Sequence, residues 1–176
     1  MEQQRRCRRL KMQVLVKPGD VSWAAFAARA PAFTLRRRKA TAAQLAGLRF
    51  EKEALAFLSH SFPGTFVPRP WFRYMAAGEN ELRWCQPDGL LFQPRTGIIT
   101  IVEVKIRHTG EAWQKLSGLY SAVTGALFPP HLWQIALCEF TRMYDCAVAC
   151  QEQPRLHAQV SEVRPGEFGV VTWKPR

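Results

Sequence analysis

The stretch that decides the fold is QPDGLLFQPRTGIITIVEVKIRHT, from Gln86 to Thr109. Its second half is rich in β-branched residues, which predicts a strand over 98–107 that is covered on both faces. Glu103 and Lys105 interrupt this apolar run. Charged side chains in a buried strand cost free energy unless a partner compensates them. The two charges therefore indicate either a functional site or a structural Glu–Lys ion pair.

A second strand is predicted over 82–92, and we expect the two strands to form a hairpin around the turn QPRTG. Because side chains alternate along a strand, Asp88 lies at the end of one apolar face. By the same alternation, Glu103 and Lys105 lie at the end of the corresponding face of the other strand. The hairpin is therefore predicted to bring Asp88 and Glu103 together.

Two converging carboxylates in an apolar setting cannot both stay ionised without a cation. Lys105 supplies one positive charge, and a divalent metal would supply more. Oxygen ligands without His or Cys suit Mg²⁺ or Mn²⁺. A metal held by one or two carboxylates, with open positions, is the arrangement of metal-assisted phosphodiester hydrolysis. Lys105 could there orient or deprotonate the attacking water, or stabilise developing charge on the phosphate.

A helix is predicted upstream, over 41–62, with Thr41 as N-cap and Gln44 at the capping-box position. Glu51 lies in the middle of its predicted apolar stripe, where a solubilising charge is not expected. The alternative is a carboxylate that pairs locally, for instance with Lys52. The predicted stripe consists of Gln44, Leu48, Glu51, Leu55, Leu58 and Phe62.

The remaining chain predicts an α/β fold in which helices flank a central mixed β-sheet. Residues 1–40 read as a basic N-terminal arm or peripheral layer with a strand over 13–20 and a helix over 21–30, and 41–176 as one domain. Further strands are expected over 65–75 and 131–140, and helices over 110–125 and 143–153. A closing hairpin is predicted from 157–163 and 168–173.

The pattern Pro87-Asp88, fourteen residues, then Glu103-Val104-Lys105 resembles the signature of the PD-(D/E)XK nuclease superfamily. The upstream GLRFE, which contains Glu51, is similar to that family's first acidic motif, so the resemblance covers about 43–120. It implies a restriction-endonuclease-like core and a Mg²⁺-dependent nuclease. It also implies that Asp88 and Glu103 bind the metal, that Glu51 supports them, and that Lys105 is catalytic.

The net charge of +11 favours a polyanionic partner, either nucleic acid or an anionic membrane surface. No stretch of the sequence reaches the ~18 apolar residues of a membrane span. The five cysteines have no paired CxxC spacing and read as free thiols in a reducing compartment, which favours the cytoplasm. The candidate substrate-binding residues around the site are Arg83, Arg95, Arg107, His108, Gln114 and Lys115.

Trp71, Trp84 and Trp113 lie among these residues, and they either stack on exposed bases or belong to the core. No helix-turn-helix or zinc-finger signature is visible, which favours recognition of DNA shape, ends or single strands over a long specific sequence. We therefore expect a DNA nuclease, and an endonuclease rather than an exonuclease. A homodimer is compatible with this chemistry. The alternative is a non-catalytic nucleic-acid-binding protein on the same fold.

Overall fold

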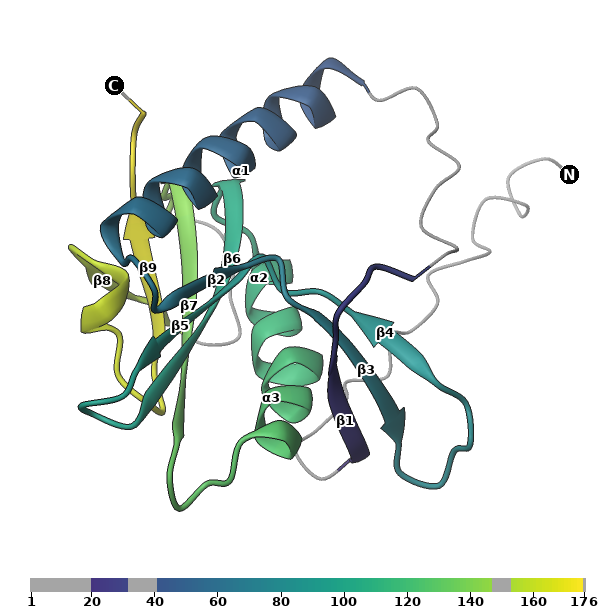
Figure 1. The fold of residues 1–176 in the computed structure, drawn as a ribbon. Helices are drawn as coiled ribbons and strands as arrows, with labels where there is room; N and C mark the ends of the chain where they lie inside the picture. The colour runs from purple at the N-terminus through teal and green to yellow at the C-terminus, as the bar shows by residue number, and fades with distance from the viewer. Residues whose placement is uncertain (1–19, 32–40, 147–152, 176) are drawn as a thin grey trace, which may run out of the picture.

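A central mixed β-sheet organises the chain (Figure 1), for which a computed structural model describes residues 20–31, 41–146 and 153–175. In spatial order its strands are β2 (Phe66–Pro68), β5 (Gly89–Gln93), β6 (Ile98–Arg107), β7 (Gln134–Met143), β9 (Phe168–Thr172) and β8 (Arg155–His157). Strands β2, β5 and β6 pair antiparallel, whereas β6, β7, β9 and β8 run parallel. The fold is therefore α/β with a mixed sheet, as the sequence predicts.

A second, antiparallel sheet consists of β1 (Val21–Ala27), β3 (Trp71–Ala76) and β4 (Arg83–Cys85), and we call it the wing sheet. Figure 1 shows it beside the central sheet, with a helical segment between the two. The chain passes from β4 into β5 through 86–88, so the wing sheet leads directly to Asp88. The position of the wing sheet therefore limits where Asp88 can lie at the start of β5.

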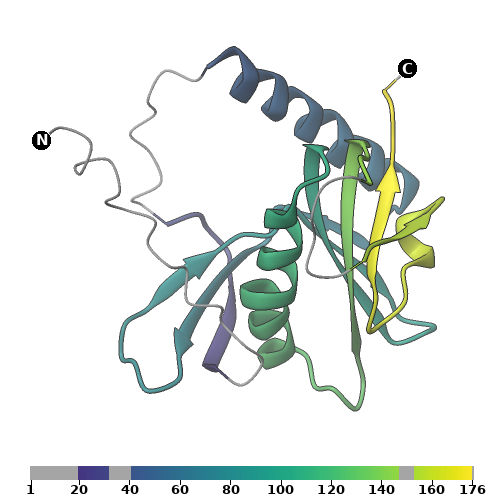
Figure 2. The same ribbon diagram turned by 180° about the vertical axis from the view of Figure 1, so that it is seen from behind.

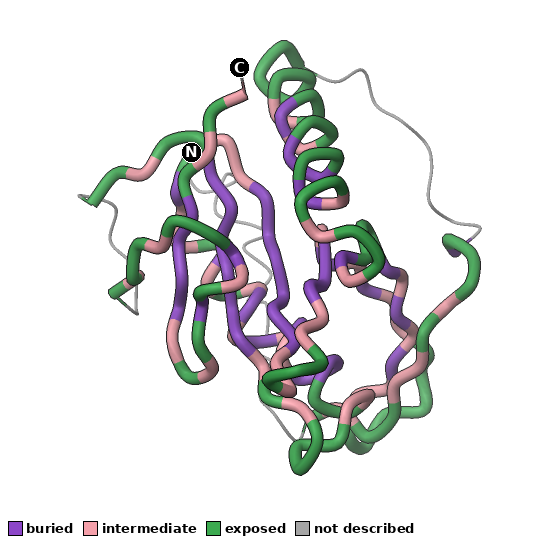
Figure 3. The backbone as a smooth tube through the Cα atoms, turned by 60° about the vertical axis from the view of Figure 1, so that its left-hand side comes forward, coloured by how far each residue is buried: buried purple, intermediate pink, exposed green. Residues whose placement is uncertain are grey.

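Helices cover both faces of the central sheet. Helix α1 (Ala42–Ser61) packs on one face, where Leu58 joins Val102 and Val104 of β6 in one core cluster. On the other face lies a continuous helical segment, seen well in Figure 2. It consists of α2 (Gly110–Lys115), the π-helical turn η2 (Leu116–Tyr120) and α3 (Ser121–Leu127). Figure 3 shows that the most deeply buried backbone belongs to the strands between these two layers.

Several predictions from local pattern are confirmed. Thr41 caps α1 with a capping box, in which its hydroxyl accepts the Gln44 N–H at 3.2 Å and Gln44 Oε1 accepts the Thr41 N–H at 2.9 Å. Strand β6 spans 98–107 as predicted, and β5 and β6 form the predicted hairpin. Its turn needs glycine at Gly97, where φ is +66° and a Cβ would lie 2.9 Å from the Leu132 carbonyl oxygen.

The predicted helix over 21–30 is wrong, because Val21–Ala27 is strand β1 of the wing sheet. Part of the predicted arm is therefore built into a sheet. The predicted strand over 65–75 divides into β2 and β3, which belong to different sheets, and that over 82–92 divides into β4 and β5. Proline explains both breaks, since Pro68, Pro70 and Pro87 cannot donate a backbone hydrogen bond to a sheet.

The predicted C-terminal hairpin is also wrong. Strand β9 lies between β7 and β8 and is parallel to both, and residues 160–162 form a single 3-10 turn, η3 (Val160–Glu162). Strand β7 continues to Met143, into the region predicted as a helix over 143–153, and 147–152 lie outside the described residues. The predicted strand over 13–20 lies almost wholly outside them as well.

The buried stripe of α1 also differs from prediction. Its buried residues are Phe50, Ala54, Leu55 and Leu58, whereas Leu48 is 53% exposed. Glu51 lies between Leu58 and Leu55 around the helix axis, within the buried face as predicted, although its side chain is 24% exposed. Among the described residues, no helix is both long and apolar enough to cross a membrane.

Candidate active site

The β5–β6 hairpin places Asp88 beside Glu103. Gly89, the first residue of β5, pairs with Val102, so the residues next to them in each strand are neighbours. Gly89 has to be glycine, because a Cβ there would overlap the ring of Phe66. The Asp88 carboxylate is fixed by a hydrogen bond in which its Oδ2 accepts the Val104 N–H at 2.7 Å. The predicted convergence of the two carboxylates is confirmed.

Glu103 is only 2% exposed, and one of its carboxylate oxygens forms ion pairs with two lysines. Its Oε1 accepts from Lys105 Nζ at 2.8 Å and from Lys115 Nζ at 3.0 Å. Its Oε2 is buried and has no hydrogen-bond partner among the described residues. A buried carboxylate oxygen without a donor is costly unless a cation or a proton occupies it. Oε2 is thus a vacant acceptor next to Asp88.

The surroundings of the site raise the pKa of both Asp88 and Lys105. The pKa of Asp88 is raised to about 7, first by burial and then by the nearby Glu103 carboxylate, while the Val104 N–H acts in the opposite direction. Burial lowers the pKa of Lys105, but Glu103 and Asp88 outweigh burial, so the net direction is upward. Lys105 is therefore an ammonium at neutral pH, which suits it to charge stabilisation more than to proton abstraction.

The donor set fits a hard divalent cation. Asp88 and Glu103 present carboxylate oxygens, and Mg²⁺ is commonly held by one or two carboxylates with water in its other positions. No cluster of three or more His, Cys, Asp and Glu suited to a metal occurs in the described parts of the chain. The two carboxylates alone would therefore hold such an ion. The vacant Glu103 Oε2 is the observation that agrees with this fit.

Glu51 approaches the site but pairs with another residue. Its Oε1 accepts from Arg69 Nη2 at 2.8 Å and from Arg69 Nε at 3.1 Å, instead of pairing with Lys52. The Arg69 backbone N–H also donates to the Asp88 carbonyl at 2.8 Å. The charge of Glu51 contributes to the raised pKa of Asp88. Glu51 is thus near enough to Asp88 for its charge to act there, while its carboxylate is paired with Arg69.

The candidate substrate-binding residues separate into two groups. Lys115 is at the centre of the site, and Arg107 and Gln114 are exposed near it, at the end of β6 and on α2. Arg95 lies in the hairpin turn, about 16 Å along β6 from Glu103, so the structure does not bring it to the site.

His108 and Arg83 are already engaged. His108 is 3% exposed, and its Nδ1 lies 2.8 Å from Glu139 Oε2, so the prediction that it contacts DNA does not fit its burial. Arg83 forms an ion pair with Glu79 at 2.7 Å in the wing sheet. Trp113 is half-buried and packs against the core, on Phe168 at 5.2 Å between ring centroids.

Sequence reasoning missed Arg69 and Glu139, and the structure adds a contact of Tyr120. Tyr120 donates its hydroxyl to the Gln86 carbonyl at 3.0 Å, and burial together with Glu103 and Asp88 raises its pKa. Arg69 holds Glu51, and Glu139 forms the buried pair with His108. Glu139 interrupts an apolar strand just as Glu103 does, and that pattern could have identified it. The π turn follows Lys115 and ends at Tyr120, and such turns are frequent at functional sites.

A separate cavity of about 350 Å³ lies between α1 and β9. Its lining is largely apolar and includes Phe57, Phe140 and Trp173, whereas neither Asp88 nor Glu103 lines it. The Asp88–Glu103 pair is therefore separate from this cavity. The reactive groups belong to the carboxylate pair and not to the cavity.

Without metal, the free energy of unfolding is expected to fall by about 1 kcal/mol between pH 6 and pH 8 through Asp88 alone. The folded-state pKa of about 7 lies above the ordinary value of 3.8, so the folded protein binds this proton more tightly than the unfolded chain does. Stability is therefore lost as the pH rises through about 7.

Urea unfolding in EDTA at both pH values measures this effect. Asp88→Asn, which keeps an acceptor for the Val104 N–H, is expected to show a smaller decrease than the wild type. An equal decrease in both proteins would show that Asp88 is not the responsible group. Mg²⁺ is expected to restore wild-type stability at pH 8 and to leave the variant unchanged.

Comparison with protein-family models, with curated proteins and with solved structures finds no match for this chain.

Proposed function

We propose that the protein is a metal-dependent nuclease that hydrolyses phosphodiester bonds of DNA. The observation that carries the proposal is Glu103, a buried carboxylate with two lysines on Oε1, a vacant Oε2 and Asp88 beside it. Two carboxylates for a cation, next to two ammonium groups for a phosphate, make up the apparatus of metal-assisted phosphodiester hydrolysis. The net charge of +11 adds attraction for a polyanion.

The residues of the site have two roles in this proposal, which are metal binding and stabilisation of negative charge on the phosphate. Asp88 and Glu103 would hold Mg²⁺ or Mn²⁺, and the bound ion would activate water and polarise the phosphate. Lys105 and Lys115 then neutralise charge that develops on the phosphate, from positions fixed by Glu103. The Glu51–Arg69 pair steadies the segment that enters Asp88.

The proposal also covers the nuclease superfamily and the mode of cleavage. The motif Pro87-Asp88…Glu103-Val104-Lys105 at the end of an antiparallel hairpin supports a PD-(D/E)XK nuclease with a restriction-endonuclease-like core. We propose an endonuclease that acts in the cytoplasm and reads DNA structure or ends, and a homodimer is compatible with this chemistry. A non-catalytic nucleic-acid-binding protein is the other candidate, but the vacant oxygen and the paired lysines would have no purpose in it.

The test is cleavage of supercoiled plasmid, linear duplex, single-stranded and four-way-junction DNA, with Mg²⁺ or Mn²⁺ and with EDTA. Wild type is expected to cut only with metal, and Glu103→Gln is expected not to cut, since it removes a metal ligand. Glu53→Gln is the matched control, because Glu53 is exposed on α1. Tight DNA binding by wild type without cleavage in either metal would leave the non-catalytic candidate.

Thermal unfolding gives a second readout of the same site. Mg²⁺ is expected to raise the melting temperature of wild type and of Glu53→Gln, because a ligand that binds only the folded state stabilises it. The same addition is expected to leave Glu103→Gln unchanged.

A further inference from the structure

The outward face of the wing sheet carries tryptophans and an arginine side by side. Trp23 pairs with Met75, and Arg73 pairs with Trp84, so all four side chains share one face. Phe72, Tyr74 and Cys85 point to the opposite face and are buried against the core. The outward face is therefore not needed to close the core, and Trp23 is 40% exposed on it.

Arg73 lies between two indole rings. Its guanidinium carbon is 6.0 Å from the centroid of the Trp23 ring and 5.9 Å from that of Trp84, which is cation–π distance. Trp71 adds a third indole, 6.4 Å from Trp84 at an interplanar angle of 77°. The Arg73 Nε is buried and has no hydrogen-bond partner in the described chain. The face thus offers aromatic surface together with a cation that forms no ion pair with a carboxylate of the described residues.

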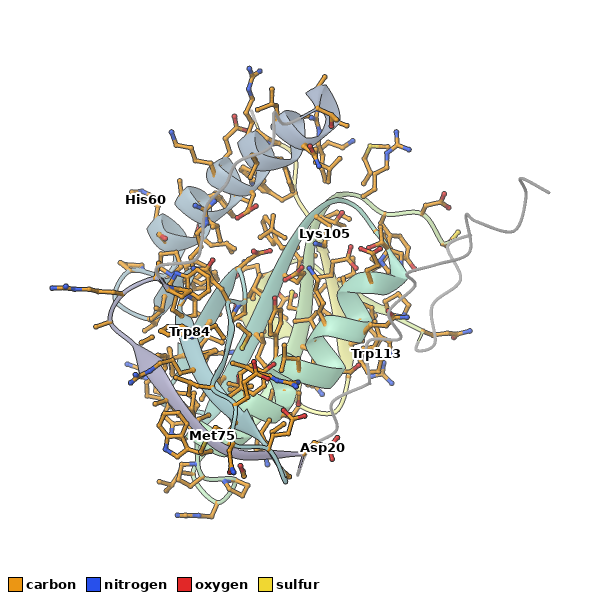
Figure 4. The ribbon with its side chains drawn as sticks, turned by 90° about the vertical axis from the view of Figure 1, so that its right-hand side faces the viewer. Asp20, His60, Met75, Trp84, Lys105 and Trp113 are labelled. Atoms are coloured by element: carbon orange, nitrogen blue, oxygen red, sulfur yellow. The ribbon has the colours of Figure 1, made fainter. Side chains whose placement is uncertain are left out.

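This face is close to the candidate active site and rigidly connected to it. Trp84 precedes Asp88 by four residues, which limits their Cα atoms to about 14 Å even in a fully extended chain. The connecting Gln86 is held at both ends, since its side chain donates to the Arg69 carbonyl and its own carbonyl accepts from Tyr120. Figure 4 shows the wing sheet with Trp84 beside the central sheet with Lys105.

Charge is distributed along the wing in a way that suits an anionic polymer running toward the site. Arg83 is neutralised by Glu79 in the β3–β4 hairpin, away from Asp88. Arg73 on the sheet face brings positive charge closer to the carboxylates, whereas Arg69 at the entry to Asp88 is paired with Glu51. Positive charge beside aromatic rings is the combination found on surfaces that bind single strands.

We infer that the wing face stacks unpaired bases of the strand whose backbone lies at Asp88 and Glu103. The inference rests on the proposed nuclease function and names its substrate class as single-stranded nucleic acid, or the single-stranded side of a junction with duplex. Bases inside a duplex are stacked on one another, so their faces cannot reach Trp23 or Trp84. Duplex binding therefore does not use this face.

The test is binding, measured in EDTA so that it is independent of cleavage. Fluorescently labelled single-stranded DNA, single-stranded RNA of the same sequence, duplex DNA and a single-strand–duplex junction are titrated with wild type, Trp23→Ala and Trp84→Ala. Each substitution is expected to raise the Kd for the single strand and the junction by about five- to a hundredfold and to leave the Kd for duplex unchanged.

Two further variants separate stacking from damage to the fold. Trp23→Phe keeps an aromatic face and is expected to bind close to wild type. Phe26→Leu is the matched control, because Phe26 is on the same strand but packs on Phe72 and Phe128. Should Trp84→Ala fail to fold, the comparison of Trp23→Ala with Trp23→Phe carries the test, since Trp23 lies at the sheet edge.

The Kd values for RNA and DNA show which class of single strand the wing face binds. The same tryptophan dependence for RNA and DNA supports a stacking surface that tolerates either sugar, and dependence for DNA alone supports a DNA surface. An unchanged Kd for single strands in both alanine variants overturns the inference. Failure of the proposed function looks different, because wild type would then cut nothing with Mg²⁺ whatever these Kd values are.

Discussion

Lys105→Ala is expected to lower the rate of Mg²⁺-dependent cleavage by about a thousandfold, the effect typical of removing one preorganised charge-stabilising group. The melting temperature is expected to change little, because Glu103 keeps Lys115 as a partner on the same oxygen. The measurement is single-turnover cleavage of the preferred substrate. Lys52→Ala, an exposed lysine on α1, is the matched control and is expected to cleave like wild type.

Lys115→Ala is expected to have a smaller effect, about tenfold, on the same rate. Its side chain is 43% exposed, compared with 26% for Lys105, so solvent screens its charge more strongly. Replacing both lysines leaves a buried carboxylate without a cation, so the double variant should lose more stability than the two single losses combined. A larger cleavage defect for Lys115→Ala than for Lys105→Ala would reverse the roles assigned here.

His108→Ala is expected to lower the free energy of unfolding by about 3 kcal/mol, because it leaves Glu139 buried without its partner. For a chain of this size that corresponds to a decrease in melting temperature of about 6–12 °C. Both side chains are almost wholly buried, with exposed fractions of 1% and 0%. His131→Ala, at an exposed histidine, is the control and should leave the melting temperature within about 2 °C of wild type.

A double-mutant cycle identifies the cause of that loss. His108→Ala combined with Glu139→Leu removes both polar partners, so it should recover part of the stability that His108→Ala loses. If the double variant is instead less stable than His108→Ala, the loss comes from packing around the imidazole, which contacts Tyr144 and Phe168. Urea unfolding of the four proteins provides the comparison.

Local patterns in the sequence sufficed for the hairpin and the pair of carboxylates. Strand β6, the positive φ of Gly97 in the turn and the cap at Thr41 depend on neighbours within a few residues. Asp88 and Glu103 meet because a hairpin fixes their register, and alternation along two strands is enough to predict it.

Long-range pairing decided what the sequence did not predict. The alanine-rich 21–30 has good helix propensity, but pairing with β3 makes Val21–Ala27 a strand. Strand β9 lies between β7 and β8, which no turn signal in the tail indicates. The contact of Lys115 with Glu103 depends on how α2 is rotated against the sheet, and that rotation is set by packing of residues far apart in sequence.

The position of β9 also has a consequence for translation. Leu116 and Tyr120, the first and last residues of the π turn after Lys115, pack in one cluster with Phe168 and Val170 of β9. The ribosome makes Asp88, Glu103 and both lysines well before it makes this strand. Because pairing between distant segments forms late, the helix that carries Lys115 lacks its full support while β9 is still unsynthesised. A growing chain therefore carries every reactive group of the site before it can hold them in place.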